Sequence, residues 1–247
     1  MEKIITKNQV IHTIGAKLEK EFSANGFKYI KSKKDLIRKN KDGFDRIIFN
    51  TYNSYPISHQ KLSIGFQKRI NLVEEVVNQF YDERFMNTEF HKTTVTVYSD
   101  NELLKEFYDN EFKSENSADC LICTQIKDLE KNGFILHTES DIENIASLLV
   151  VFIRDKVLPF FDVNNDLNYV NESEKKEMIE VFELKGWIDP ISFMRSLVLM
   201  KLTKDTSYQV VKNEYIDRMI VPANPDVHAL KIEAVKELIT YLESKEF

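Results

Sequence analysis

The sequence contains few glycines and prolines, and this shortage excludes several classes of fold and site. Only 6 glycines and 5 prolines occur among 247 residues. Barrels and sandwiches with many tight turns need more of both residues, and so do long flexible linkers. The glycine-rich loops that hold phosphate are missing as well, because neither GxxxxGK[ST] nor GxGxxG occurs. We therefore expect a globular chain in which helices dominate.

Cysteine is also scarce, and two cysteines in a chain of this length do not form a disulfide framework. They occur in the segment DCLIC as Cys120 and Cys123, a spacing found in zinc knuckles and redox motifs. A structural zinc ion needs about four ligands, and the nearest histidine is His137. A helix over 117–131 would also direct the two thiols to different sides. Cys120, Cys123 and His137 are candidate metal ligands, but we expect incidental thiols and no cofactor.

No apolar run is long enough to span a bilayer, since the longest, Ile145 to Ile153, is interrupted by Ser147. The N-terminal residues MEKIITKNQV lack the apolar core of a signal peptide. Together with the cysteine content, these features lead us to expect a cytoplasmic protein that does not bind a membrane.

Catalytic signatures are missing too. The five histidines form neither HExxH nor HxH, and no serine lies in a GxSxG elbow. A metal-dependent nuclease site would need carboxylates on neighbouring strands, but the predicted strand 61–69 has none and Asp45 stands alone on its neighbour. We therefore expect a protein that is not an enzyme. An enzyme whose site is assembled from scattered residues stays open as an alternative.

The hydrophobic spacing predicts a helix and then a sheet in the N-terminal part. Helix 8–25 is amphipathic, because Ile11, Ile14 and Leu18 recur at steps of three and four. Strand patterns follow at 27–39, 44–52, 61–69 and 91–100, with a helix at 71–81 between the last two. These elements predict an N-terminal helix packed on a roughly four-stranded antiparallel sheet.

From residue 117 onward the patterns are almost entirely helical. Ser140-Asp141-Ile142-Glu143 resembles a capping box and is predicted to begin a helix. Pro159 is predicted to end that helix. The predicted helices are 117–131, 140–158, 173–185, 190–202, 206–220 and 226–244, with one short strand at 133–137. The fold class is therefore α+β, with a sheet domain over 1–115. A mostly helical region over 116–247 is packed on this domain or continuous with it.

The net charge of −6 conceals a strong asymmetry along the chain. Residues 1–70 hold 15 Lys or Arg against 6 Asp or Glu, a local charge of +9, whereas residues 71–247 hold 19 against 34, a local charge of −15. This separation indicates either a basic face presented to an anionic partner or two halves that attract each other.

The positive charge is concentrated in residues 26–46, GFKYIKSKKDLIRKNKDGFDR. The candidate residues for binding nucleic acid or another anion are Lys28, Lys31, Lys33, Lys34, Arg38 and Lys39. An unbroken strand would place Lys31, Lys33 and Lys39 on one face and the other three on the opposite face. The aromatic residues between them are compatible with base stacking or with a core. Three interpretations stay open: a solvated face, a surface for an acidic protein or for the chain's own acidic half, and a nucleic-acid surface.

Three segments resemble a group of bacterial proteins of unknown function. They are NGFKYIKSKKDLIRKN, ESDIENIASLLVVFIRDKVLPFF and SFMRSLVLMKLTKDTSYQVVKNEYIDRM. The shared pattern is an N-terminal helix ending in Gly-Phe, a basic hairpin, a Leu-Pro-Phe-Phe corner and a helical tail. The resemblance implies no catalytic residues, and it favours an accessory or immunity-type protein over a metabolic enzyme.

Together these features lead us to expect a binding protein whose partner is another macromolecule. A protein partner is favoured, because the strongly acidic helical half could dock a basic partner. Nucleic-acid binding through residues 28–46 is the alternative.

Overall fold

A computed structural model of the chain describes residues 5–54, 59–81, 94–98, 134–183, 188–218 and 225–245. The chain forms two compact units that are interleaved along the sequence. The sheet unit comprises residues 1–68 and 98–161, and the helical unit comprises residues 69–97 and 162–247. The expected boundary between residues 115 and 116 lies outside the described residues.

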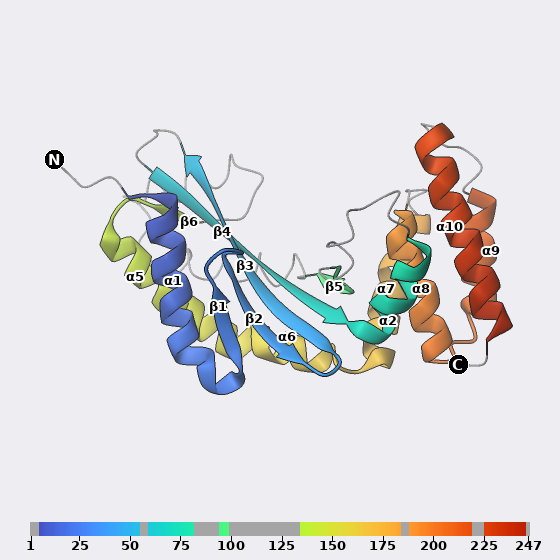
Figure 1. The fold of residues 1–247 in the computed structure, drawn as a ribbon, viewed down its shortest axis with the longest axis horizontal. Helices are drawn as coiled ribbons and strands as arrows, with labels where there is room; N and C mark the ends of the chain where they lie inside the picture. Colours follow the sequence, from blue (N-terminus) through green and yellow to red (C-terminus); the bar gives the residue numbers. More distant parts are fainter. Residues whose placement is uncertain are drawn as a thin grey trace. The chain divides into compact units, whose positions relative to one another are not determined.

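The N-terminal part of the chain forms a helix and a sheet, as Figure 1 shows. Helix α1 (Lys7–Phe22) and a short 3-10 turn, η1 (Ser23–Asn25), precede the strands. The sheet contains β1 (Phe27–Ile30), β2 (Asp35–Asn40), β3 (Gly43–Ser54), β4 (His59–Ile70), β5 (Val97–Tyr98) and β6 (Phe134–Leu136). The strands lie in the order β1-β2-β3-β4-β5, and β6 also pairs with β4. The predicted α+β fold is confirmed.

The first predicted strand, 27–39, is two strands in the structure, so this part of the prediction is wrong. The chain reverses at residues 31–34, where the N–H groups of Lys33 and Lys34 donate to the carbonyl oxygen of Ile30 (3.0 and 2.9 Å). Lys34 has a left-handed backbone (φ 59°), which closes the turn without a glycine. The turn also changes which side chains share a face. Lys28 lies opposite Ile37 in the antiparallel register, so Lys28 and Lys39 are on the same face.

The N-terminal helix packs closely on the sheet. Its start is capped by Thr6, whose hydroxyl accepts a hydrogen bond from the N–H of Gln9 (3.2 Å). At Gly15 an added Cβ would lie 2.5 Å from the ring of Tyr29, so only glycine allows this approach. The hydroxyl of Tyr29 lies 2.8 Å from Nδ1 of His12, within hydrogen-bond distance. Helix α1 is therefore held on β1 by the close approach of Gly15 to the Tyr29 ring and by the polar contact between His12 and Tyr29.

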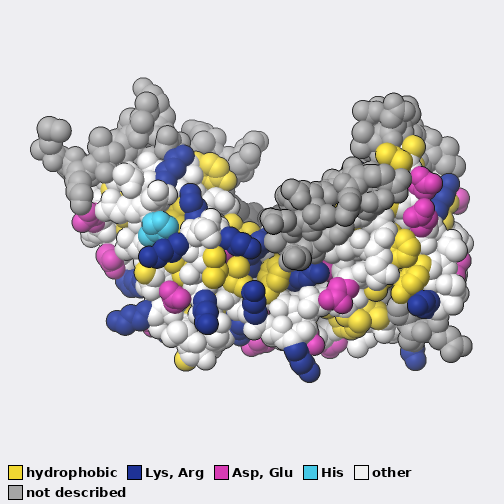
Figure 2. Space-filling model, in the orientation of Figure 1, with side chains coloured by type: hydrophobic (Ala, Val, Ile, Leu, Met, Phe, Trp, Pro, Cys, Tyr) yellow, Lys and Arg dark blue, Asp and Glu magenta, His cyan; other side chains and the backbone are white. Residues whose placement is uncertain are grey.

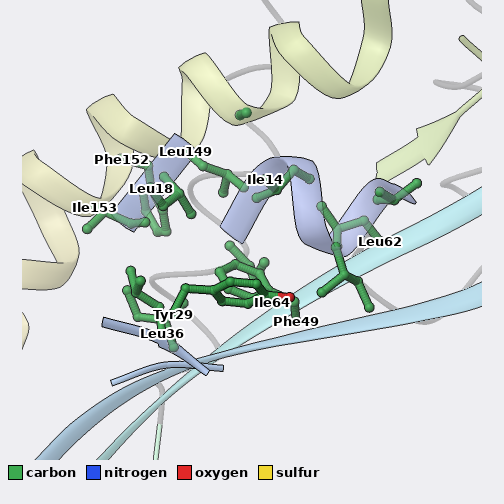
Figure 3. Close-up of a cluster of buried hydrophobic side chains, with 14 of the residues drawn as sticks. Ile14, Leu18, Tyr29, Leu36, Phe49, Leu62, Ile64, Leu149, Phe152 and Ile153 are labelled. Atoms are coloured by element: carbon green, nitrogen blue, oxygen red, sulfur yellow. The ribbon is translucent and has the colours of Figure 1, made fainter. Parts of the chain in front are cut away.

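The core of the sheet unit lies between one face of the sheet and two helices, α1 and α5 (Glu139–Phe152). Figure 3 shows Leu18 of α1 and Leu149 of α5 directed towards sheet side chains such as Phe49. All three of these side chains are buried. Because both helices cover this face, the side chains on the opposite face are the ones available for contacts outside the core.

Helix α5 begins at a capping box two residues before the predicted one. The hydroxyl of Thr138 accepts from the N–H of Asp141 (3.1 Å), and the carboxylate of Asp141 accepts from the N–H of Thr138 (2.8 Å). The predicted end at Pro159 is wrong. A π-helical segment, η3 (Ile153–Val157), follows α5 and leads directly into α6 (Leu158–Val163). Pro159 lies directly after this π-helical segment, and such a local change in the hydrogen-bond ladder is where a helix accommodates a proline, which has no N–H to donate.

The helical unit is built around one buried helix. Its helices are α2 (Asn71–Phe80), α7 (Leu167–Glu183), α8 (Pro190–Leu202), α9 (Tyr208–Arg218) and α10 (Pro225–Ser244). Helix α8 is buried along most of its length and contacts each of the other four. Its start is fixed by Asp189, whose carboxylate accepts from the N–H of Ile191 (3.0 Å). All five helices were predicted, and their ends agree to within two residues except at the start of α7, which lies six residues before the predicted start at residue 173.

Two other predicted elements fall partly or wholly outside the described residues. Of the strand predicted at 91–100, residues 94–98 are described, and among these Val97–Tyr98 is a strand and residues 94–96 are not. The helix predicted at 117–131 lies outside the described residues. Among the helices that the structure describes, none combines the length and the apolar character needed to cross a bilayer.

Candidate functional site

The predicted binding residues lie on the hairpin of β1 and β2, and the structure divides them into two groups. Four are exposed and have no ion-pair partner within the described part of the chain: Lys28, Lys31, Lys33 and Lys39. Figure 2 shows Lys and Arg side chains gathered over the strands of the sheet unit. The other two, Lys34 and Arg38, are half-buried. The exposed group is therefore the part that is available to an anionic partner.

Arg38 is engaged in a buried cluster of charges. Its Nε donates to Oδ2 of Asp45 (2.8 Å), and the Nζ of Lys68 donates to Oδ1 of the same carboxylate (2.8 Å). The side chains of Asp45 and Lys68 are only 1% and 4% exposed. The guanidinium of Arg38 also lies 5.0 Å from the ring centre of Phe27. We therefore interpret Arg38 as a structural cation that joins β2, β3 and β4.

The face of the sheet opposite the core combines lysines with isoleucines. Ile30, Ile37 and Ile48 are half-buried there, with Ile37 opposite Lys28 and the other two opposite Asp35. The sequence analysis did not single out these isoleucines. Their alternation with lysine is visible only once the turn at residues 31–34 separates the two strands. We call this surface, Lys28, Lys39 and the three isoleucines, the outer face.

The carboxylate of Asp35 also belongs to this side of the sheet, and its charge is matched locally. Arg46 lies 3.7 Å from Asp35 and donates from Nε to the side-chain oxygen of Gln67 (2.9 Å). Burial raises the pKa of the Asp35 carboxyl, and the positive charges of Arg46 and Lys33 oppose this increase. The exposed lysines therefore dominate the charge that the outer face presents.

The aromatic residues interleaved with the basic ones divide between the core and the outer side of the sheet, where Phe44 is half-buried opposite Lys39 and Tyr52 follows on the same side of β3. Phe27, Tyr29 and Phe49 are buried, whereas Tyr52 is 54% exposed. Stacking on successive nucleic-acid bases needs a row of accessible rings. The described strands therefore supply basic and aliphatic side chains to the outer face more than they supply stacking platforms.

The candidate metal ligands are not brought together in the described part of the chain. Cys120 and Cys123 lie outside the described residues. His137 is exposed, and its backbone N–H donates to Asp141 (2.8 Å), which is the capping carboxylate of α5. No group of three or more potential metal-ligating side chains gathers among the residues that the structure describes.

A second group of charges is buried in the helical unit. Glu74 is fully buried, and its Oε1 accepts from Nε of Arg195 (2.7 Å) and from the hydroxyl of Thr96 (3.0 Å). Burial raises the pKa of nearby Glu174 to about 7, and the negative charge of Glu177 adds to this effect. The only sequence signal for this network is an arginine inside the otherwise apolar segment SFMRSLVLM. Because the network holds α8 against α2, we interpret it as structural.

The geometry thus offers an outer face with exposed lysines and two buried clusters whose charges are already matched. A comparison of the chain with protein-family models, with curated proteins and with solved structures finds no match.

Proposed function

We propose that this chain is a binding protein whose sheet unit docks an acidic region of another protein. The outer face supports this proposal, because exposed lysines without ion-pair partners in the described part of the chain lie beside half-buried isoleucines. Protein interfaces combine such an apolar centre with a polar rim, and complementary charge selects the partner and speeds the encounter. The expected partner therefore carries Asp or Glu side chains around an apolar patch.

The arrangement of aromatic side chains favours a protein over a nucleic acid as the partner. A nucleic-acid surface would gain affinity from exposed rings, but Phe27, Tyr29 and Phe49 are used in the core. A protein partner uses the aliphatic side chains of the outer face instead. An accessory or immunity-type role in a bacterium agrees with such binding and rests on the sequence resemblance alone.

The test is an affinity capture from a lysate of the native host with three forms of the chain. The first is the unchanged protein, and the second is Lys28→Gln/Lys39→Gln on the outer face. The third is the matched control Lys7→Gln/Lys20→Gln, which removes the same charge from exposed positions on α1. We expect the unchanged protein and the control to retain the same partner, and the outer-face variant to lose it.

The capture also distinguishes the class of partner. Binding to an acidic protein should weaken as salt is added and should persist after nuclease treatment. Loss of the captured protein after nuclease treatment would assign the outer face to nucleic acid and contradict the proposal. Equal capture by all three forms would show that the outer face is not the docking surface.

A further inference from the structure

A pocket of about 500 Å³ lies in the helical unit. It is formed where the end of α8, the start of α9 and the end of α10 meet, the helices drawn at the C-terminal end of the chain in Figure 1. The side chains that line it include Lys201, Lys204 and Lys245, together with Asp205 and Tyr208. The volume falls in the range of small-molecule sites. We call it the lysine pocket.

The backbone at the end of α8 places one of these lysines in a left-handed position. The N–H of Asp205 donates to the carbonyl oxygen of Met200 (2.8 Å), and the N–H of Lys204 donates to that of Lys201 (3.2 Å). These two bonds form a Schellman motif, which usually has glycine at the position of Lys204 (φ 56°). A lysine there costs conformational energy, and such strain is characteristic of positions that serve a site.

The one carboxylate that lines the pocket is fully engaged with other groups. Asp205 accepts hydrogen bonds from Nζ of Lys175 (2.8 Å), from Nδ2 of Asn171 (2.7 Å) and from the N–H and hydroxyl of Ser207 (2.8 and 2.6 Å). Burial alone would raise the pKa of Asp205, but the hydrogen bonds from Lys175 and Ser207 outweigh it and hold the pKa well below its usual range. Asp205 therefore stays ionised and shapes the loop, with its charge already matched by Lys175.

The three lysines of the pocket are matched less closely. The hydrogen bond from Lys212 (2.6 Å) is the main cause that lowers the pKa of the Glu243 carboxyl, and the charge of Lys201 makes a smaller contribution. In the described part of the chain, no carboxylate lies within ion-pair distance of Lys201, Lys204 or Lys245. Two of them instead lie against aromatic rings. The Nζ of Lys201 is 4.3 Å from the ring centre of Tyr208, and that of Lys245 is 4.9 Å from the ring centre of Tyr241. Three cations and one carboxylate that is already bonded to Lys175 leave the pocket with an excess of positive charge, which favours the binding of an anionic ligand.

Tyr208 provides an independent indication of a ligand. Its side chain is 4% exposed, and its hydroxyl is buried without a hydrogen-bond partner. Burial raises the pKa of Tyr208 to about 12, and the negative charge of Glu243 adds to the increase, so the hydroxyl keeps its proton at neutral pH. A buried hydroxyl without a partner is unfavourable in the free protein. Tyr208 lines the pocket, so a ligand whose binding makes the hydroxyl accessible would supply the missing acceptor oxygen.

We propose that the lysine pocket binds the phosphate group of a small molecule, which Lys201, Lys204 and Lys245 hold by charge and Tyr208 holds by a donated hydrogen bond. A phosphate group offers several acceptor oxygens and more than one negative charge, which suits a site with three ammonium groups and a hydroxyl donor. The volume of the pocket leaves room for more than the phosphate alone. This site is separate from the outer face and does not depend on the proposed docking function.

The test is a calorimetric titration of the full chain with inorganic pyrophosphate and with adenosine diphosphate, at constant ionic strength and with acetate as the reference anion. We expect both phosphates to bind and acetate to show no measurable binding. Tighter binding of adenosine diphosphate would assign the rest of the cavity to an organic group, and equal binding would assign the phosphate subsite alone. Either result supports the site, and no binding of either phosphate would overturn it.

Substitutions distinguish phosphate binding in the pocket from a general attraction between phosphate and the positive charges of the chain. Lys201→Gln/Lys204→Gln should weaken phosphate binding by about tenfold or more, since a hydrogen bond to a charged group commonly changes affinity by that factor. The control Lys236→Gln, at an exposed position on α10, should leave the affinity unchanged. An equal loss in the control, or no loss in the double variant, would overturn the proposal.

Tyr208→Phe gives a further readout that a structural tyrosine would not give. The variant keeps the ring against Lys201 and removes only the hydroxyl without a partner. The thermal unfolding midpoint of the free protein should therefore not fall, while phosphate affinity should decrease by roughly threefold to tenfold. A lower midpoint together with unchanged affinity would contradict the assigned role.

Discussion

The outer face and the lysine pocket are both rich in lysine, but the first is an open face of a sheet and the second is a pocket between helix ends. On the outer face, lysines of β1 and β2 stand exposed on a sheet, in the segment of the chain with the strongest positive charge. In the lysine pocket, Lys201, Lys204 and Lys245 line a cavity within the residues 71–247, whose net charge is −15. The net charge of a segment therefore does not locate its binding sites. An open surface suits a macromolecule, and a pocket suits a small anion.

The two surfaces also share an unusual backbone feature. Lys34 beside the outer face and Lys204 in the pocket are the two non-glycine residues with positive φ in the described part of the chain (59° and 56°). Glycine or asparagine would fit each position with less strain. Substitutions can separate the basic residues that stabilise the fold from those that are available for binding.

The largest expected effect concerns the buried carboxylate that holds Arg38. Asp45→Ala should lower the free energy of unfolding by about 3–5 kcal/mol, because Lys68 would be left buried without a carboxylate. The exposed residue Asp42 provides the control, and Asp42→Ala should change the free energy by less than about 0.5 kcal/mol. Urea denaturation measures both values. Equal stability of the two variants would mean that Arg38 is not a structural cation.

The stability of the helical unit should depend on pH through the buried carboxyl of Glu174. The pKa of Glu174 is about 7 in the folded chain, above the ordinary value of 4.5. Between pH 4.5 and about pH 7, the Glu174 carboxyl is therefore protonated in the folded state and mostly ionised in the unfolded state. Stability from Glu174 is complete below about pH 4.5 and is lost as the pH rises through about 7, by about 1–3 kcal/mol.

Urea denaturation at pH 5 and pH 8 checks this expectation. Glu174→Gln should remove most of the pH-dependent loss and should be more stable than the unchanged protein at pH 8, because an amide does not ionise. The same pH dependence in both proteins would show that the effect arises from another group.

A smaller effect is expected from relieving the backbone strain at the two left-handed lysines. Lys34→Gly and Lys204→Gly should each raise the free energy of unfolding by about 0.5–1 kcal/mol, since the strain removed exceeds the added entropy of the unfolded chain. Only Lys204→Gly should also weaken phosphate binding. Thermal unfolding and titration with pyrophosphate measure the two effects, and weaker phosphate binding in Lys34→Gly would contradict the separation of the two surfaces.

The sequence predicts helices better than it predicts turns in this chain. The bounds of α8 follow directly from the sequence, because Asp189 and Pro190 form a local start signal and an apolar segment follows. The strand predicted at 27–39 is wrong because the turn at residues 31–34 is made of lysine and serine. A left-handed lysine gives no signal that composition can detect.

The same holds for the candidate binding residues: some are recognisable from their neighbours in the sequence, and others only from contacts between distant segments. The exposed lysines of the hairpin are recognisable as a basic cluster in the sequence. The role of Arg38 is not, because its partners Asp45 and Lys68 come from two other strands and meet it only through the register of the sheet. The lysine pocket escapes sequence reading for the same reason, since its side chains come from the ends of three helices.

The most direct test of the distinction between the two surfaces is a backbone amide NMR titration of the full chain with pyrophosphate. The account predicts saturable shifts at Lys204, Asp205 and Tyr208, while the amides of Lys31 and Lys33 in the exposed turn change little. Saturable shifts centred on the hairpin, with none at the end of α8, would contradict it.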